Sequence, residues 1–141
     1  MIPKWLQRKL LNRSAPPSET TRRGNQGEDL AAEYISADLG YKLVDRNWRS
    51  GRHEIDIICW DGPVLVFVEV RSRAAEAMVS GFYTINRDKK AAIRKACLQY
   101  LKGCRPRPRV FRFDVAEIRL GVKDDPVRYF HNVPLFSKYQ T

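Results

Sequence analysis

The chain has 141 residues and a formal net charge of +10, and 43% of its residues are hydrophobic. This length suffices for one domain with a proper core and is short for two. Its longest apolar runs fall far below the roughly 20 residues that span a bilayer, which argues against insertion in a membrane. A strong basic excess is typical of proteins that meet polyphosphate, so nucleic acid, first of all DNA, is the leading partner. A solvated basic surface, a ribosomal role or contact with a membrane surface are alternatives for the same charge.

The three cysteines, Cys59, Cys97 and Cys104, are odd in number and show no CxxC spacing. Neither a disulfide framework nor a zinc site is indicated, and reduced thiols in a cytoplasmic protein are expected. Cys59 and Cys97 fall in apolar patterns, so we expect buried small side chains there rather than a catalytic thiol.

Residues 1–23 carry six Lys or Arg and one Glu, around a stretch without periodicity. We therefore predict a flexible basic arm over 1–23 and one folded domain over 24–141. Apolar residues at helical spacing predict a first helix over 28–39, with Gly40 placed to end it. Residues 41–48 are predicted as a strand, followed by a polar turn over 49–52.

The clearest strands are predicted over 53–60 and 64–73, which are rich in Ile, Val and Phe and are separated by Asp61, Gly62 and Pro63. They form a predicted β-hairpin whose second arm alternates valines on one face with Leu65, Phe67 and Glu69 on the other.

Residues 74–85 show no firm pattern and are predicted as a mobile loop. Asn86 is placed to cap a second helix with an apolar face, and Gly103 to end it. A stiff basic linker over 105–109 and strands over 110–118 and 127–132 complete the chain. The fold class is therefore α/β, a single small domain with a mixed central sheet flanked by helices.

Two acidic residues interrupt the apolar strands of the hairpin. Asp56 stands within Ile55–Ile58, and Glu69 follows the run Val64–Val68. Strands disfavour Asp, and a buried unpaired carboxylate is costly. With a two-residue or four-residue loop the two side chains share a face, whereas a three-residue loop would separate them. A water-facing Asp56 on an edge strand is the alternative.

Glu28 at the start of the first helix shares a stripe with Ala31 and Ile35 and so leans toward the sheet. The favourable helix dipole is the alternative reason for its position. Adjacent carboxylates repel unless a proton or a divalent cation lies between them, and oxygen ligands suit Mg²⁺ or Mn²⁺. Arg71 shares the face of Glu69 and can reach a phosphate. The set predicts a catalytic metal site, and a structural salt-bridge network is the alternative.

The stretches GNQGEDLAAEYI, LGYKLVDRNWRSGRHEIDIICW and LVFVEVRSR carry a family resemblance. They resemble the YraN-like proteins, an uncharacterised bacterial family similar to archaeal Holliday-junction resolvases of the PD-(D/E)XK nuclease superfamily. The resemblance covers most of residues 24–118. Its specific part is the order of Glu, Asp and Glu-x-basic in a helix and hairpin context.

The resemblance implies a restriction-endonuclease-like (PD-(D/E)XK) core in which Glu28, Asp56 and Glu69 hold Mg²⁺ or Mn²⁺. Arg71 stands where the superfamily usually has lysine. Lysine can lose a proton and help to activate water, whereas arginine stays charged and clamps phosphate. Lys89, at the start of the second helix, could supply a replacement amine, and an ordinary exposed helix lysine is the alternative. His53, where the family more often has glycine, could touch the metal or substrate, and a surface histidine in a turn is the alternative.

The expected function is a metal-dependent, endonuclease-like phosphodiesterase that acts on DNA, with branched DNA among the candidate substrates. One alternative is a nuclease-fold module that binds nucleic acid without cleaving it, and another is a basic interaction protein with an acidic partner. A homodimer is expected only by analogy with resolvases. The residues expected to contact nucleic acid are Arg71, Arg73, Lys89, Lys90, Arg105, Arg107 and Arg109.

Overall fold

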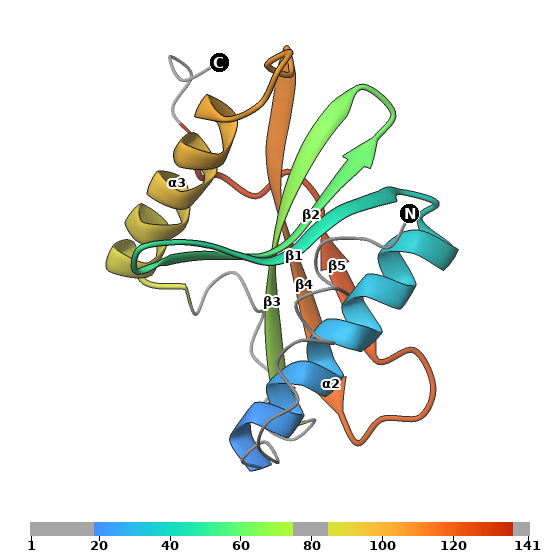
Figure 1. Cartoon of the computed structure of the whole chain (residues 1–141). Helices are drawn as coiled ribbons and strands as arrows, with labels where there is room; N and C mark the ends of the chain where they lie inside the picture. Colours follow the sequence, from blue (N-terminus) through green and yellow to red (C-terminus); the bar gives the residue numbers. More distant parts are fainter. Residues whose placement is uncertain (1–18, 75–84, 137–141) are drawn as a thin grey trace, which may run out of the picture.

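The computed structural model describes residues 19–74 and 85–136 and shows a five-stranded sheet with helices packed on its faces (Figure 1). The first helix, α2, passes directly into a π-helical turn, η1. The elements in chain order are α2 (Glu19–Glu33), η1 (Tyr34–Asp38), β1 (Lys42–Ser50), β2 (His53–Asp61), β3 (Val64–Ala74), α3 (Arg87–Lys102), β4 (Val110–Leu120) and β5 (Val127–Phe130).

The strands lie in the order β1-β2-β3-β4-β5. All neighbours are antiparallel except β3 and β4, which run parallel over their whole length. A parallel pair needs a long crossover connection, and α3 lies within that connection. The predicted α/β domain with a mixed central sheet flanked by helices is confirmed.

Alternating side chains of the sheet build two cores. Phe67 of β3 and Phe113 of β4 pack with the apolar face of α3, including Ile93, whereas Val66 and Val68 pack with α2. Burial of a large apolar side chain contributes roughly 1.5–3 kcal/mol, so both helices are held mainly through these faces. The predicted alternation along β3 is confirmed. Cys59 and Cys97 are buried free thiols, one in each core, as expected.

The first helix begins at Glu19 and not at Glu28, so the prediction of its start was wrong. Residues 19–27 have no apolar residue and include two glycines, which weaken the helical signal. The helix ends in the π-turn, where the Leu39 amide donates to the Tyr34 carbonyl at 3.0 Å, and Gly40 then adopts φ +71°. Residues 1–18 of the predicted arm lie outside the described residues.

The other boundaries agree closely with the sequence. Asp61 pairs with Val64, so the hairpin loop has two residues, Gly62 and Pro63. The Asn86 side chain accepts a hydrogen bond from the Lys89 amide at 2.8 Å and caps α3 as predicted. Most of the predicted mobile loop, residues 75–84, lies outside the described residues. No helix in the described part of the chain has the length and apolar character needed to cross a bilayer.

Candidate functional site

The β2–β3 hairpin opens at Asp56 and Glu69. Their ladder ends at the pair Ile57 and Val68, and the next residues in that register are Asp56 and Glu69. Asp56 Oδ2 accepts a hydrogen bond from the Val70 amide at 2.8 Å, and its carboxyl group also hydrogen-bonds the Glu69 side chain. The two-residue loop therefore brings the two carboxyl groups together, as strand parity predicted.

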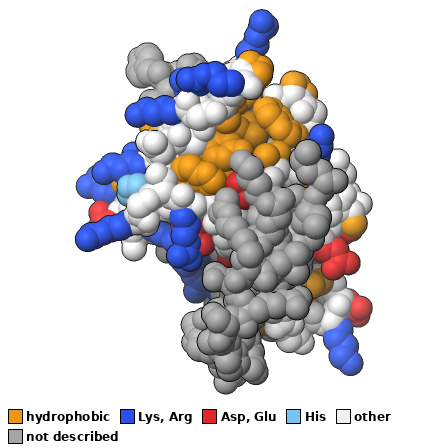
Figure 2. All heavy atoms as spheres, in the orientation of Figure 1, with side chains coloured by type: hydrophobic (Ala, Val, Ile, Leu, Met, Phe, Trp, Pro, Cys, Tyr) orange, Lys and Arg blue, Asp and Glu red, His pale blue; other side chains and the backbone are white. Residues whose placement is uncertain are grey.

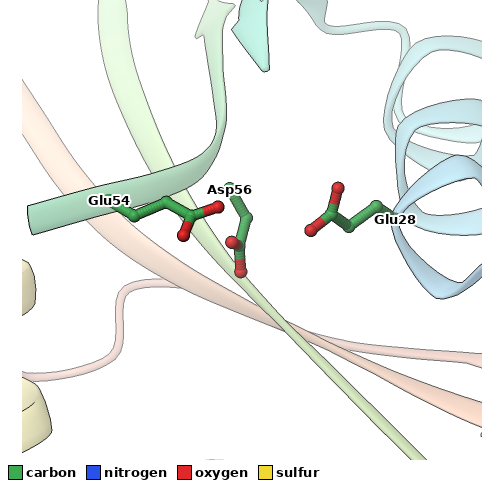
Figure 3. A group of neighbouring side chains, drawn as sticks. All are labelled: Glu28, Glu54 and Asp56. Atoms are coloured by element: carbon green, nitrogen blue, oxygen red, sulfur yellow. The ribbon is translucent and has the colours of Figure 1, made fainter. Parts of the chain in front are cut away.

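A pocket of about 540 Å³ lies where the strands separate. One wall carries acidic side chains from α2 and β2, and the other is the last part of β3. Glu28 points across the gap from α2 toward Asp56, and Glu54 approaches Asp56 from the same strand (Figure 3). The lining residues are Glu28, Glu54, Asp56, Glu69, Val70, Arg71, Ser72, Arg73, Ala74 and Leu120.

Glu28 is held at the pocket by residues of β1. The Asn47 side chain hydrogen-bonds its carboxylate, and Arg46 Nη2 lies 3.7 Å from Glu28 Oε2. Burial first, and then the nearby charges of Asp56 and Glu54, raise the pKa of Glu28 to about 7, although Asn47 and Arg46 act in the opposite direction. Glu28 is therefore poised to hold or release a proton near neutral pH.

Glu54 is a site residue that the sequence analysis missed. Carboxylate oxygens of Glu28, Glu54 and Asp56 all lie within 4.8 Å of one another. Glu54 also lies 3.5 Å from the guanidinium group of Arg49. Its spacing of two residues from Asp56 was the available signal, because residues i and i+2 of a strand share a face.

Asp56 and Glu69 behave as a coupled pair. Burial raises the pKa of both groups, and the charge of Asp56 raises the pKa of Glu69 further. Raised pKa values favour a proton between the two carboxyl groups, and a bound cation would favour its release. Lys89 Nζ, from the first turn of α3, lies 3.7 Å from Glu69 Oε1 and favours the ionised form. The structure thus brings Lys89 to the acidic site.

The five arginines among the predicted basic residues fall into two groups. Arg71 and Arg73 line the pocket. Arg105, Arg107 and Arg109 are exposed just before Val110, which pairs with Val64 at the opposite end of β3. Arg105 Nη1 donates to the Lys102 and Cys104 carbonyls, at 2.9 Å each, at the end of α3. Lys90 is half-buried.

Further basic side chains gather at one edge of the molecule. Figure 2 shows Lys and Arg gathered at the left of the visible face, where Figure 1 has the tip of the β1–β2 hairpin and the start of α3. Exposed basic residues in these two segments are Arg49, Arg52, Arg87 and Lys89. Of these, only Lys89 was among the predicted contacts.

The raised pKa of Glu28 predicts how stability depends on pH. Without divalent cations, the folded protein keeps this proton up to about pH 7, whereas the unfolded chain releases it near pH 4.5. The folded state binds more protons in that window, so its stability falls as pH rises from about 5 to about 7. Urea unfolding in a chelating buffer should show that the free energy of unfolding falls less steeply with rising pH for Glu28→Gln than for wild type. Glu33→Gln, exposed on the same helix, is the control, and equal slopes for wild type and Glu28→Gln would contradict the prediction.

Comparison with known proteins places these residues in a family. Residues 27–118 match the uncharacterised protein family UPF0102. The chain belongs to this family. A UPF0102 protein of Chlorobium limicola is 41% identical over 108 residues, which cover 76% of this chain and 83% of that protein. A UPF0102 protein of Anaeromyxobacter dehalogenans is 37% identical over 107 residues, covering 76% and 79%, and one of Rhodococcus jostii is 38% identical over 103 residues, covering 73% and 86%.

The expected membership in the YraN-like family is confirmed at this level. The match to UPF0102 runs from Gly27 through the pocket and most of β4, so it includes the four pocket carboxylates, Lys89 and Arg71. It begins after the start of α2 and ends before β5. The acidic pocket therefore lies within the part of the chain that matches the family.

Proposed function

We propose that this UPF0102 chain is a divalent-metal-dependent phosphodiesterase of the endonuclease type that acts on DNA. The observation that carries the proposal is the meeting of Glu28, Glu54 and Asp56 in one pocket, with oxygens within 4.8 Å of one another. Arginines of β3 line the same pocket. Carboxylates beside cations are the combination needed to bind a hard metal and a phosphate together.

The donor set fits Mg²⁺ or Mn²⁺. All the candidate ligands are carboxylate oxygens, which Mg²⁺ prefers, and their side chains would have to move closer together to close on an ion, because adjacent ligands of octahedral Mg²⁺ lie ~2.9 Å apart. A cation would offset both the burial and the repulsion from Asp56 that raise the pKa of Glu28. Glu28, Glu54 and Asp56 would hold the ion, and Glu69 could join them on losing its proton. A bound ion would supply Lewis-acid stabilisation of the charge that develops on a phosphodiester.

The basic side chains have distinct parts in this proposal. Arg71 in the pocket would clamp a non-bridging phosphate oxygen, because a guanidinium stays charged and donates several hydrogen bonds. Lys89, 3.7 Å from Glu69, would supply the amine that position 71 lacks. The exposed residues Arg49, Arg52 and Arg87 would contact the backbone on either side of the scissile phosphate.

A PD-(D/E)XK core is proposed on the same grounds. Its support is the order of Glu28, Asp56 and Glu69 along the chain, on a helix and a hairpin of a mixed sheet. A second function, binding of nucleic acid without cleavage, is favoured by one observation, the presence of Arg71 at the pocket position that follows Glu69 by two residues.

Asp56→Asn tests the function with little change in shape, because the amide oxygen can still accept the Val70 hydrogen bond. We expect the variant to bind Mn²⁺ at least ~10-fold more weakly and to lose cleavage of supercoiled, single-stranded and branched DNA. Calorimetric Mn²⁺ titration and gel assays measure both. Asp38→Asn, an exposed carboxylate at the end of η1, is the control.

The outcomes separate the candidate functions. DNA and Mn²⁺ binding by wild type without any cleavage would favour the second function. Mn²⁺ affinity of Asp56→Asn equal to that of wild type would contradict the metal site. DNA affinity should also fall steeply with added salt if the basic residues contact phosphates.

A further inference from the structure

Asn47 stands at an irregularity of β1 directly beside the acidic pocket. Its φ of +53° lies in the left-handed region, which is uncommon for a strand residue other than glycine. The flanking pairs are Arg46 with Ile57 and Trp48 with Ile55, so Asn47 lies opposite Asp56 in this register. Asn47 and Asp56 thus occupy one row across the sheet, and Glu69 continues it.

Strand alternation breaks at this row. Ile55 packs in the core on the α3 side and Ile57 in the core on the α2 side, although residues two apart in a regular strand share a face. Across from them, Trp48 packs on the α3 side, whereas Arg46 reaches the carboxylates of α2. Asn47, with its left-handed backbone, lies at the position where the alternation of side chains between the two faces of the sheet is interrupted.

The Asn47 side chain hydrogen-bonds Glu28, the one pocket carboxylate that comes from a helix. Asparagine tolerates a left-handed backbone better than most residues, but glycine tolerates it best. Backbone geometry alone would therefore favour glycine here. Asparagine adds an amide that can donate to a carboxylate, which indicates a role for the side chain.

We propose that Asn47 is a positioning residue that holds the Glu28 carboxylate toward Asp56 for cation binding. The inference rests on the proposed metal site. The left-handed backbone aims the amide at Glu28, and the hydrogen bond restricts the rotamers of a long side chain that would otherwise have to be ordered when an ion binds.

Asn47→Gly separates the contribution of the side chain from that of the backbone conformation, because glycine keeps the left-handed conformation and lacks the side-chain amide. We expect Mn²⁺ affinity to fall ~10-fold or more, the usual effect of losing a partner that orients a metal ligand. The melting temperature should be kept or raised. Asn132→Gly is the matched control, since Asn132 has φ +54° and lies outside the pocket, and its Mn²⁺ affinity should stay within about twofold of wild type.

Equal Mn²⁺ affinity in Asn47→Gly and wild type would overturn the role of Asn47 and leave the metal site standing. If wild type itself bound no Mn²⁺, the proposed function would fail. The rotamer order of the Glu28 side chain, measured from NMR scalar couplings in metal-free protein, would then decide the role of Asn47. Increased rotamer averaging of Glu28 in Asn47→Gly, absent in Asn132→Gly, supports positioning, and unchanged couplings overturn it.

Discussion

Asp114→Ala is expected to destabilise the protein by ~3–5 kcal/mol, the range for breaking one side of a buried charge pair. Asp114 of β4 is fully buried, with 0% of its surface exposed. Its carboxylate accepts hydrogen bonds from Arg112 Nε at 3.0 Å, the Tyr129 hydroxyl at 2.6 Å and the Asn132 amide at 2.8 Å. Removing it leaves a cation, a hydroxyl and an amide without their acceptor in the interior.

The network extends beyond β4, which explains why its loss should affect the whole fold. Arg112 also donates to Asp61 at the hairpin turn, at 2.8 Å, and to the Tyr41 hydroxyl at 3.0 Å. Burial first, and then the charge of Asp114, raise the pKa of Tyr129 far above its ordinary value, so this hydroxyl remains a donor at any working pH. Asp114 thus links β4 to β5, to the hairpin and to the residue before β1.

Urea unfolding followed by circular dichroism measures the effect. Asp61→Ala is the matched control: it removes an acceptor of the same guanidinium, but Asp61 has 40% of its side chain exposed, and we expect a loss of about 1 kcal/mol or less. In the double variant Asp114→Leu/Arg112→Met, apolar groups replace the pair, and only part of the stability should return, because the Tyr129 hydroxyl and the Asn132 amide still lack their acceptor. Equal losses for Asp114→Ala and Asp61→Ala would contradict the interpretation.

Asp56 and Asp114 show what a strand pattern can and cannot predict. Both interrupt apolar strands, and the same signal marks both. Asp114 is enclosed by donors from Arg112 and Tyr129, whereas Asp56 lies at an open pocket with other carboxylates. Arg112 and Glu54 lie only two residues from these aspartates, but Tyr129, Glu28 and Glu69 come from other elements of the chain. The sequence therefore predicts that an acidic side chain has a special environment, but not whether that environment is basic or acidic.

The predictions succeeded where residues close together in the sequence determine the local structure. A two-residue turn determined the pairing of Asp56 with Glu69, and Asn86 capped α3 as expected. The approach of Lys89 to Glu69 depends on how α3 packs on the sheet, so the sequence could name Lys89 as a candidate amine but could not distinguish it from an exposed helix lysine. The left-handed turn at Asn47 was equally hidden, because nothing in a single strand requires it.

Gly27→Ala should destabilise the protein by ~1–3 kcal/mol and weaken Mn²⁺ binding. In an open helix position the same change would stabilise by up to ~1 kcal/mol, so the sign of the effect is the test. A Cβ built on Gly27 would lie 1.8 Å from Ser72 Oγ and 3.1 Å from Ser72 Cβ. Helix α2 therefore touches β3 at this point without room for a methyl group.

This contact sets the position of the acidic site, because Glu28 follows Gly27 directly and Ser72 lines the same pocket. If alanine pushes α2 away from β3, Glu28 moves away from Asp56, and the carboxylate cluster opens. The effect on the proposed metal site is thus a consequence of packing and not of any change in charge. Rotation of the Ser72 hydroxyl relieves only part of the clash, since Ser72 Cβ stays close.

A second substitution tests this explanation. Ser72→Gly removes both clashing atoms, so the double variant Gly27→Ala/Ser72→Gly should recover Mn²⁺ affinity. Its free energy of unfolding should also exceed the value expected from adding the effects of the two single substitutions. Gly103→Ala is the control, because a Cβ there meets only the Tyr100 carbonyl at 3.6 Å, an ordinary contact. Stabilisation by Gly27→Ala, or failure of Ser72→Gly to restore Mn²⁺ binding, would show that α2 can carry Glu28 to the pocket without this close approach.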